Sequence, residues 1–290
     1  MAGAYRSDEA DIDMDTNSNG GAVVSNKYFP QPEFLYFDSQ VKTEPVVRKL
    51  KEFNGLVSVE QKIEDVALEQ VPFLTTKSSA DVDPNMISTL HRLLRWPDSQ
   101  TFPALDILRA SLLNTGCQPL LLEKSSLDEI FSLCLRHLDK SSPPNCQMLA
   151  LRCLVNLFSS EAGRTMMRLY RDSVISRIME KLFPVVDDNK NIQTGAATLM
   201  LNYAVSLGHK FDDETQVQLM SVLSINFLTF ISDWESRFRV LVALGTLLAS
   251  SPEAVEYGRT LEIKDGVRSW RLLEGSAKVS ECAQFLEDIL

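Results

Sequence analysis

The stretch Ala150-Leu-Arg-Cys-Leu-Val-Asn-Leu-Phe158 decides the fold of this 290-residue chain. Its apolar residues recur at the spacing of one face of a helix, and related stretches return before and after it. These begin at Leu105, Ala197, Phe238 and Ala277. The steps between copies are 43, 46, 41 and 39 residues when the copies are aligned on Arg109, Arg152, Thr198, Arg239 and Lys278.

This period matches armadillo and HEAT repeats, which are roughly 40–47 residues long. One copy is too small to bury its own apolar face, so neighbouring copies must stack and share a continuous core. The sequence therefore predicts an all-α, armadillo-like helical-repeat solenoid of about six repeats.

Helical periodicity continues through most of the chain, and we find no alternating strand pattern. Ser126 with Glu129 is typical of a capping box, and Asp172, Asn189 and Ser236 are expected as N-caps. Helices are expected near 45–53, 59–74, 84–97, 103–114, 126–139, 146–158, 160–169, 173–183, 190–207, 214–231, 236–249, 252–261 and 276–290.

The N-terminal part has a different composition. Residues 1–27 are rich in Asp, Ser, Asn and Gly, which predicts a disordered acidic leader or linker. Order is expected from Tyr28-Phe-Pro30 onward, in an extended segment that carries Phe34, Tyr36 and Phe37.

Composition narrows the classes of partner. The formal net charge of −10 disfavours nucleic acid and anionic membranes, whose binding depends on Lys and Arg. Five cysteines without a CxxC pair indicate reduced thiols. Without a signal peptide or a long apolar stretch, the chain is expected in the cytoplasm and nucleus.

Chemistry-bearing motifs are scarce. His91, His137 and His209 belong to no HExxH motif and have no Cys at ligand spacing, so we expect no metal and no cofactor. Cys134, Cys153 and Cys282 lie within apolar helical stripes, where cysteine is usually a buried hydrophobe. We therefore expect a binding protein and not an enzyme, with a cysteine hydrolase as a remote alternative.

The row formed by Arg109, Arg152, Arg239 and Lys278 places a cation at the same position of successive repeats. One interpretation is a basic groove that receives an acidic, extended peptide. The other is a set of salt bridges between repeats, and the sequence favours neither. Asn156 and Asn202 lie one helical turn after the aligned position of their repeats, and their amides can bind a peptide backbone or cap loops. Tyr203, the next residue, is expected either in the groove or in the core.

Several of these stretches together resemble one known family, the PUL domain of the phospholipase A2-activating protein and Ufd3–Doa1 family. The resemblance covers about residues 28–290. It rests on the stretches Tyr28–Pro30, Phe102–Arg109, Leu149–Arg152, Ala197–Tyr203, Phe238–Thr246 and Ala277–Cys282.

The resemblance implies an armadillo-like domain whose basic groove binds the acidic C-terminal tail of the valosin-containing AAA ATPase, in the service of ubiquitin homeostasis and protein degradation. Arg109 and Arg239 match groove arginines of the family most clearly, with Arg152 and Lys278 as neighbours. No phospholipase activity is implied. Members of the family usually carry an N-terminal β-propeller and a ubiquitin-binding middle domain, neither of which is in this sequence, so ubiquitin is expected to bind only through domains absent from this chain. An alternative is a helical-repeat scaffold that binds a different partner through an apolar groove.

Overall fold

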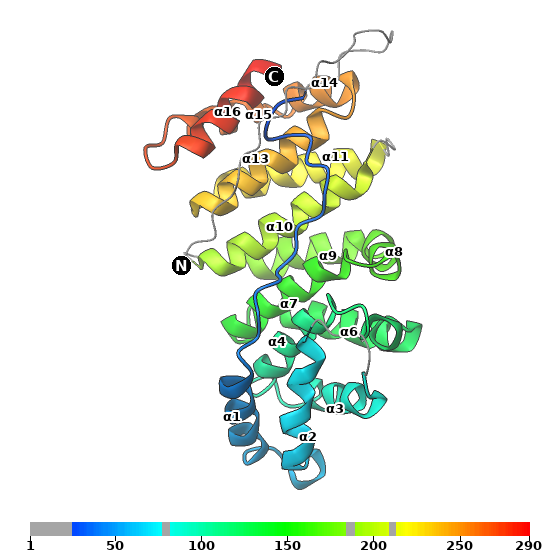
Figure 1. Cartoon of the computed structure of the whole chain (residues 1–290). Coiled ribbons are helices and arrows are strands. Elements are labelled where there is room, and N and C mark those ends of the chain that lie inside the picture. The colour runs from blue at the N-terminus through cyan, green and yellow to red at the C-terminus, as the bar shows by residue number, and fades with distance from the viewer. Residues whose placement is uncertain (1–24, 77–81, 184–188, 209–212) are drawn as a thin grey trace, which may run out of the picture.

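The computed structural model describes residues 25–76, 82–183, 189–208 and 213–290, and within them every regular element is a helix. Figure 1 shows the helices stacked in chain order from α1 at one end to α16 at the other, as the repeat pattern predicts. The expected all-α helical-repeat fold is confirmed. The expected leader falls mostly on residues outside the described ranges.

Five helices form the spine of the stack, and each packs against the next. We call the surface that they share the inner face. The spine helices are α4 (Phe102–Ser111), α7 (Pro144–Leu157), α10 (Lys190–Leu207), α13 (Trp234–Leu248) and α16 (Ala277–Ile289).

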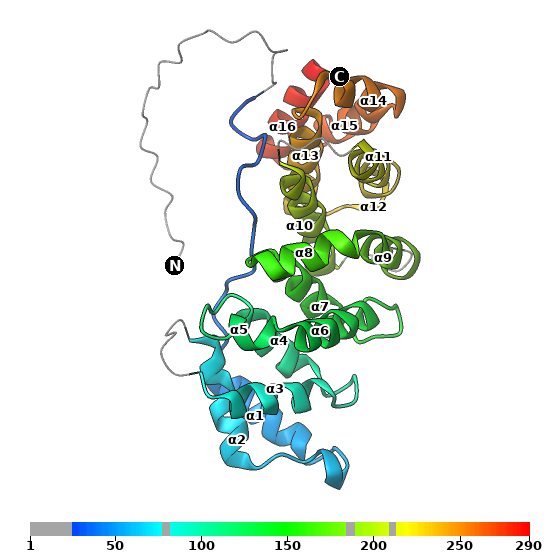
Figure 2. The same ribbon diagram turned by 90° about the vertical axis from the view of Figure 1, so that its right-hand side faces the viewer.

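The other elements cap the first end of the stack or cover the outer side of the spine (Figure 2). They are α1 (Thr43–Asn54), η1 (Val59–Gln61), α2 (Asp65–Gln70), η2 (Val71–Thr75), α3 (Pro84–Leu94), α5 (Gln118–Leu121), α6 (Lys124–His137), α8 (Glu161–Leu169), α9 (Arg171–Arg177), η3 (Ile178–Leu182), α11 (Asp213–Val222), η5 (Leu223–Phe227), α12 (Leu228–Phe230), α14 (Pro252–Thr260) and α15 (Ile263–Arg271).

The spine helices are buried on nearly all sides because neighbours contact them in several directions. In α10 the run from Gly195 to Ala204 is entirely buried. A Cβ at Gly195 would lie 3.0 Å from Cβ of Leu151, so glycine here lets α10 and α7 approach closely. This explains why the repeat motif is rich in Ala and Leu and has no continuous polar face.

Three of the expected helix starts are wrong. The α6 helix begins at Lys124 with Glu123 as its N-cap, so Ser126 lies within the first turn. Asp172 likewise lies inside α9. Asp233, not Ser236, caps α13, because its carboxylate accepts a hydrogen bond from the backbone N–H of Ser236. Asn189 is confirmed as the N-cap of α10.

The sequence also gave no sign of α15, and it suggested one helix over 59–74 where η1, α2 and η2 occur. Between α14 and α15 the chain turns at Glu262, whose φ of 54° is left-handed. Left-handed residues are usually Gly or Asn, so no turn signal marks this boundary. Gly266 in the middle of α15 further weakens its helical pattern.

Candidate functional site

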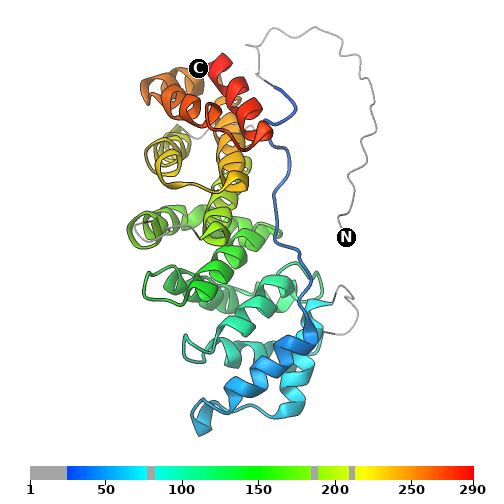
Figure 3. The ribbon, with the colours of Figure 1, turned by 90° about the vertical axis from the view of Figure 1, so that its left-hand side faces the viewer.

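An extended segment of the chain itself lies along the inner face. We call residues 28–39 the strap. Figure 3 shows it running past the spine helices from the α16 end down to α1, on the side opposite the outer helices. It therefore runs antiparallel to the order of the repeats. The expectation of an ordered, extended segment that starts near Tyr28 is confirmed.

Side chains of three spine helices hold the strap backbone, and two of them, Asn156 and Asn202, occupy the same position of their repeats. Asn156 of α7 accepts from the N–H of Phe37 at 2.8 Å and donates to its carbonyl at 3.0 Å. Asn202 of α10 makes the same pair of bonds with Leu35, at 2.9 and 2.8 Å. Thr246 of α13 accepts from the N–H of Gln31 at 3.0 Å. The inner face thus binds an extended peptide by its backbone, and the peptide is the chain's own.

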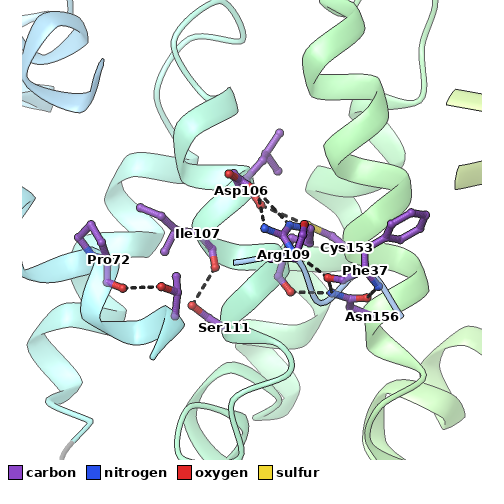
Figure 4. Close-up of polar contacts among 11 residues, drawn as sticks. Phe37, Pro72, Asp106, Ile107, Arg109, Ser111, Cys153 and Asn156 are labelled. Carbon is purple, nitrogen blue, oxygen red and sulfur yellow. Dashed lines mark hydrogen bonds and ion pairs between the residues drawn. The ribbon is translucent and has the colours of Figure 1, made fainter. Parts of the chain in front are cut away.

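Arg109 fastens the end of the strap that lies on α4 (Figure 4). Its Nη1 donates to the carbonyls of Phe37 and Ser39 at 2.8 and 2.9 Å, while Nε and Nη2 reach the carboxylate of Asp106 at 2.9 and 2.8 Å. Only 2% of the Arg109 surface is exposed. The expectation that it faces solvent in an open groove is wrong, because the strap covers it.

The other three cations of the row pack on aromatic rings. The guanidinium carbons of Arg152 and Arg239 lie 4.9 and 5.9 Å from the centre of the Phe37 ring. At the other end, Nζ of Lys278 lies 3.5 Å from the centre of the Phe238 ring. Phe238 in turn contacts Tyr28 of the strap edge-on, at 5.3 Å. Such contacts stabilise a cation on an apolar surface without a carboxylate.

The two salt bridges formed by cations of the row each join residues of one helix. Arg109 pairs with Asp106, and Arg239 pairs with Glu235 at 2.9 Å. Neither bridge joins two repeats, so the interpretation of the row as inter-repeat salt bridges is wrong for both. Arg239 does contact the preceding repeat, through a hydrogen bond to the hydroxyl of Thr198.

Arg152 differs from its neighbours. Within the described ranges it has no carboxylate partner; Nη2 donates only to the side-chain oxygen of Asn191, at 3.4 Å, and Nε is buried without an acceptor. Burial, followed by the nearby charge of Arg109, lowers the pKa of the Arg152 guanidinium, and the nearby charge of Asp106, with which Arg152 forms no salt bridge, partly opposes this. The charge persists, because arginine stays protonated in proteins. Arg152 therefore keeps a buried donor that an anion beside the strap could satisfy.

Tyr203 belongs to the core and not to the inner surface. It is 1% exposed, its hydroxyl donates to the carbonyl of Met167 at 3.2 Å, and its ring packs edge-on against Phe158. Burial raises its pKa. Of the two readings that the sequence allowed, the core one is confirmed.

Sequence reasoning missed the residues of the strap as part of this site. Leu35 and Phe37 bond to successive repeats, and Phe29 is completely buried. At the other end the hydroxyl of Tyr28 donates to Glu281 at 2.6 Å. The signal was the density of aromatic residues and prolines between 28 and 37, which is unusual for a linker. That pattern does not predict which helices the strap contacts.

All five cysteines are buried, as the apolar stripes predict for three of them. Burial raises the pKa of the Cys117 and Cys146 thiols to about 11 and that of Cys282 to about 12. Cys153 shifts in the same direction. Thiolate nucleophiles need the opposite shift.

We accordingly expect the folded protein to resist alkylation. At pH 7.5, iodoacetamide should modify Cys117, Cys146 and Cys282 at least about a hundredfold more slowly than a free cysteine peptide, because each pKa unit removes about tenfold of the thiolate. Intact mass after timed quenching measures this, with urea-unfolded protein as the fully reactive control. One cysteine labelled as fast as the peptide would revive the hydrolase alternative.

Across 25–76, 82–183, 189–208 and 213–290, no group of His, Cys, Asp or Glu side chains is arranged to hold a metal ion. Over the same ranges, no helix combines the length and the apolar character that a membrane span requires. His209 lies outside the described residues.

The fold and the inner face define a helical-repeat protein that binds extended peptide backbone. The PUL domain model matches residues 29–284, and the chain belongs to this family. It is 33% identical to the phospholipase A-2-activating protein of Xenopus laevis over 93% of this chain and 34% of that protein. It is 26% identical to the ubiquitin homeostasis protein lub1 of Schizosaccharomyces pombe over 82% of this chain and 32% of that protein. The chain thus spans about a third of the length of these relatives.

Solved structures show the same fold. A crystal structure of PUL and PFU domains has a TM-score of 0.63 at 18% identity, covering 90% of this chain and 79% of that one. The PFU–PUL domain pair of Saccharomyces cerevisiae Doa1/Ufd3 has a TM-score of 0.60 at 17% identity, over 89% and 79% of the two chains.

Proposed function

We propose that this chain is a protein-interaction module that binds the acidic C-terminal tail of the valosin-containing AAA ATPase, and that it thereby serves ubiquitin homeostasis and protein degradation. The observation that carries the proposal is Arg152, a half-buried cation without a carboxylate partner in the described chain. Arg239 lies against the same phenylalanine ring. The tail and its role come from the resemblance to the PUL family, and one relative, lub1 of Schizosaccharomyces pombe, is named a ubiquitin homeostasis protein.

The strap changes how such a tail is expected to bind. Asn156, Asn202 and Arg109 already hold the strap, so their polar groups are not free for a second peptide. The tail would instead lie beside the strap, with its carboxylates against Arg152 and Arg239. A few extended residues span these two sites, because both guanidinium groups contact the Phe37 ring. Phe37 would then position the two cations for the tail.

Replacing Arg152 with Ala should weaken binding of a synthetic tail peptide about 10- to 100-fold, the loss expected for a hydrogen-bonded charge pair. Raising the salt concentration should weaken wild-type binding as well, because the Debye length falls to roughly 3 Å at 1 M salt. Calorimetry with the tail peptide measures both effects.

Arg168→Ala provides the matched control. Arg168 belongs to α8, is 49% exposed and pairs with Glu161, so its loss removes the same charge from a helix outside the row of cations. That variant should bind like the wild type. Equal affinities for Arg152→Ala and Arg168→Ala, or wild-type binding unaffected by salt, would instead support a scaffold with an apolar groove. In a pull-down, the chain should capture full-length ATPase but not a form of the ATPase that lacks its tail.

A further inference from the structure

Three polar side chains on the outer side of the stack are connected in one line. Nε2 of His91, on α3, lies 2.6 Å from the hydroxyl of Ser126, on α6. On the opposite edge of the ring, Nδ1 of His91 lies 3.2 Å from Oε2 of Glu129. Ser126 and Glu129 are three residues apart on one helix, so they share a face of α6. The S-x-x-E spacing suggested a capping box, but here it places Ser126 and Glu129 on either side of the His91 ring.

The charges fix the direction of the hydrogen bonds. Arg95 binds both oxygens of Glu129, at 2.6 and 3.0 Å, and this hydrogen bonding is the main reason that the pKa of Glu129 lies below its usual range. An ionised Glu129 accepts the proton on Nδ1 of His91. Nε2 of the neutral ring then carries the lone pair that faces the Ser126 hydroxyl. This is the tautomer that a general base requires.

The line opens onto a cavity. A space of about 470 Å³ is bordered by all three side chains and by Ser88, Arg92 and Ser125. The 14-residue helix α6 begins at Lys124, so the N–H groups of its first turn, including those of Ser125 and Ser126, have no partner within the helix. Donors at a helix N-terminus stabilise a developing negative charge beside the hydroxyl.

We propose that Ser126, His91 and Glu129 form a nucleophilic site that hydrolyses carboxylic esters small enough for this cavity. Oγ of Ser126 bonds to the ester carbonyl carbon while its proton passes to Nε2 of His91. The C–O bond to the alcohol then breaks, and the alcohol leaves with that proton. Water attacks the acyl-serine and gives a proton to the same nitrogen, which returns it to Ser126 as the acid departs. Glu129 is a positioning residue, because it orients the imidazole and touches no reacting atom.

This site is separate from the peptide-binding surface. It lies between α3 and α6, whereas the strap contacts the spine helices, so either function can fail without the other. The three residues lie within 38 positions of one another but match no hydrolase motif, and only the packing of α3 on α6 brings them together.

A biotinylated fluorophosphonate tests the proposal on the full chain. A serine that is activated in this way attacks phosphorus and releases fluoride, so labelling should map to Ser126 by peptide mass spectrometry. Ser126→Ala should abolish the labelling. Ser132→Ala is the matched control, because Ser132 is exposed on the same helix and does not border this cavity; this variant should be labelled like the wild type.

Two more variants separate chemistry from folding. His91→Gln, which keeps the size and polarity of the side chain, should slow phosphonylation at least about 100-fold, the usual contribution of a general base. Glu129→Gln should lower the maximal labelling rate while leaving the probe concentration at half-saturation unchanged. Melting temperatures confirm that each variant is folded. Absence of Ser126 labelling in the wild type, or labelling as fast in folded His91→Gln, overturns the proposal.

Discussion

Replacing Arg109 with Ala should lower the free energy of unfolding by about 2–4 kcal/mol, the range for breaking a largely buried charged network. The substitution removes two hydrogen bonds to strap carbonyls and leaves Asp106, which is 30% exposed, without its partner. Urea denaturation followed by circular dichroism measures the loss.

The matched control for this prediction is again Arg168→Ala, a surface arginine whose removal should cost less than about 0.5 kcal/mol. Arg109→Lys should recover only part of the loss, because an ammonium group cannot bind the two carbonyls and the carboxylate with the fork geometry of a guanidinium. If Arg109→Ala has the same free energy of unfolding as the control but binds the ATPase tail more weakly, Arg109 contacts the partner and does not stabilise the docked strap.

Gly245→Ala should destabilise the protein by about 3–5 kcal/mol, as much as a large aromatic truncation in a core. A Cβ at position 245 would lie 2.3 Å from the ring of Phe29, which is completely buried against α13. The ring must therefore leave its place or α13 must move. Thermal and urea unfolding both report the change.

A double-mutant cycle identifies the cause. In a Phe29→Ala background the added methyl group meets no ring, so Gly245→Ala should cost far less there than in the wild type. Equal losses in the two backgrounds would mean that position 245 rejects a side chain for a reason unrelated to the strap.

Local pattern was enough to predict most of the helices and the stacked repeats, because each spine helix repeats its apolar spacing. It failed at Ser126, Ser236 and Glu262, where side-chain capping and a left-handed residue depend on atoms that the pattern does not contain. The row of cations was visible in sequence. What its members contact was not, since Phe37 and Ser39 lie 72 and 70 residues from Arg109.

The strap could be predicted as extended but not as docked. An extended segment has no periodicity that points to its partner, and Asn202 lies 167 residues from Leu35. Of the two roles that the sequence left open for Asn156 and Asn202, the structure shows the binding of peptide backbone. That the backbone belongs to the same chain follows from the packing of Phe29 and Phe37 and from the reach of residues 28–39, which only the three-dimensional arrangement reveals.

The strap has a consequence for how the chain acquires its structure. Stacked repeats contact mainly their neighbours, so such arrays usually have low contact order and fold progressively as they emerge from the ribosome. Here Tyr28 bonds to Glu281, 253 residues away, although it is among the first described residues to be synthesised. The strap must remain undocked until α13 and α16 exist. Docking of the strap is therefore completed only after α16 has formed, and it joins segments that would otherwise unfold locally into one cooperative unit.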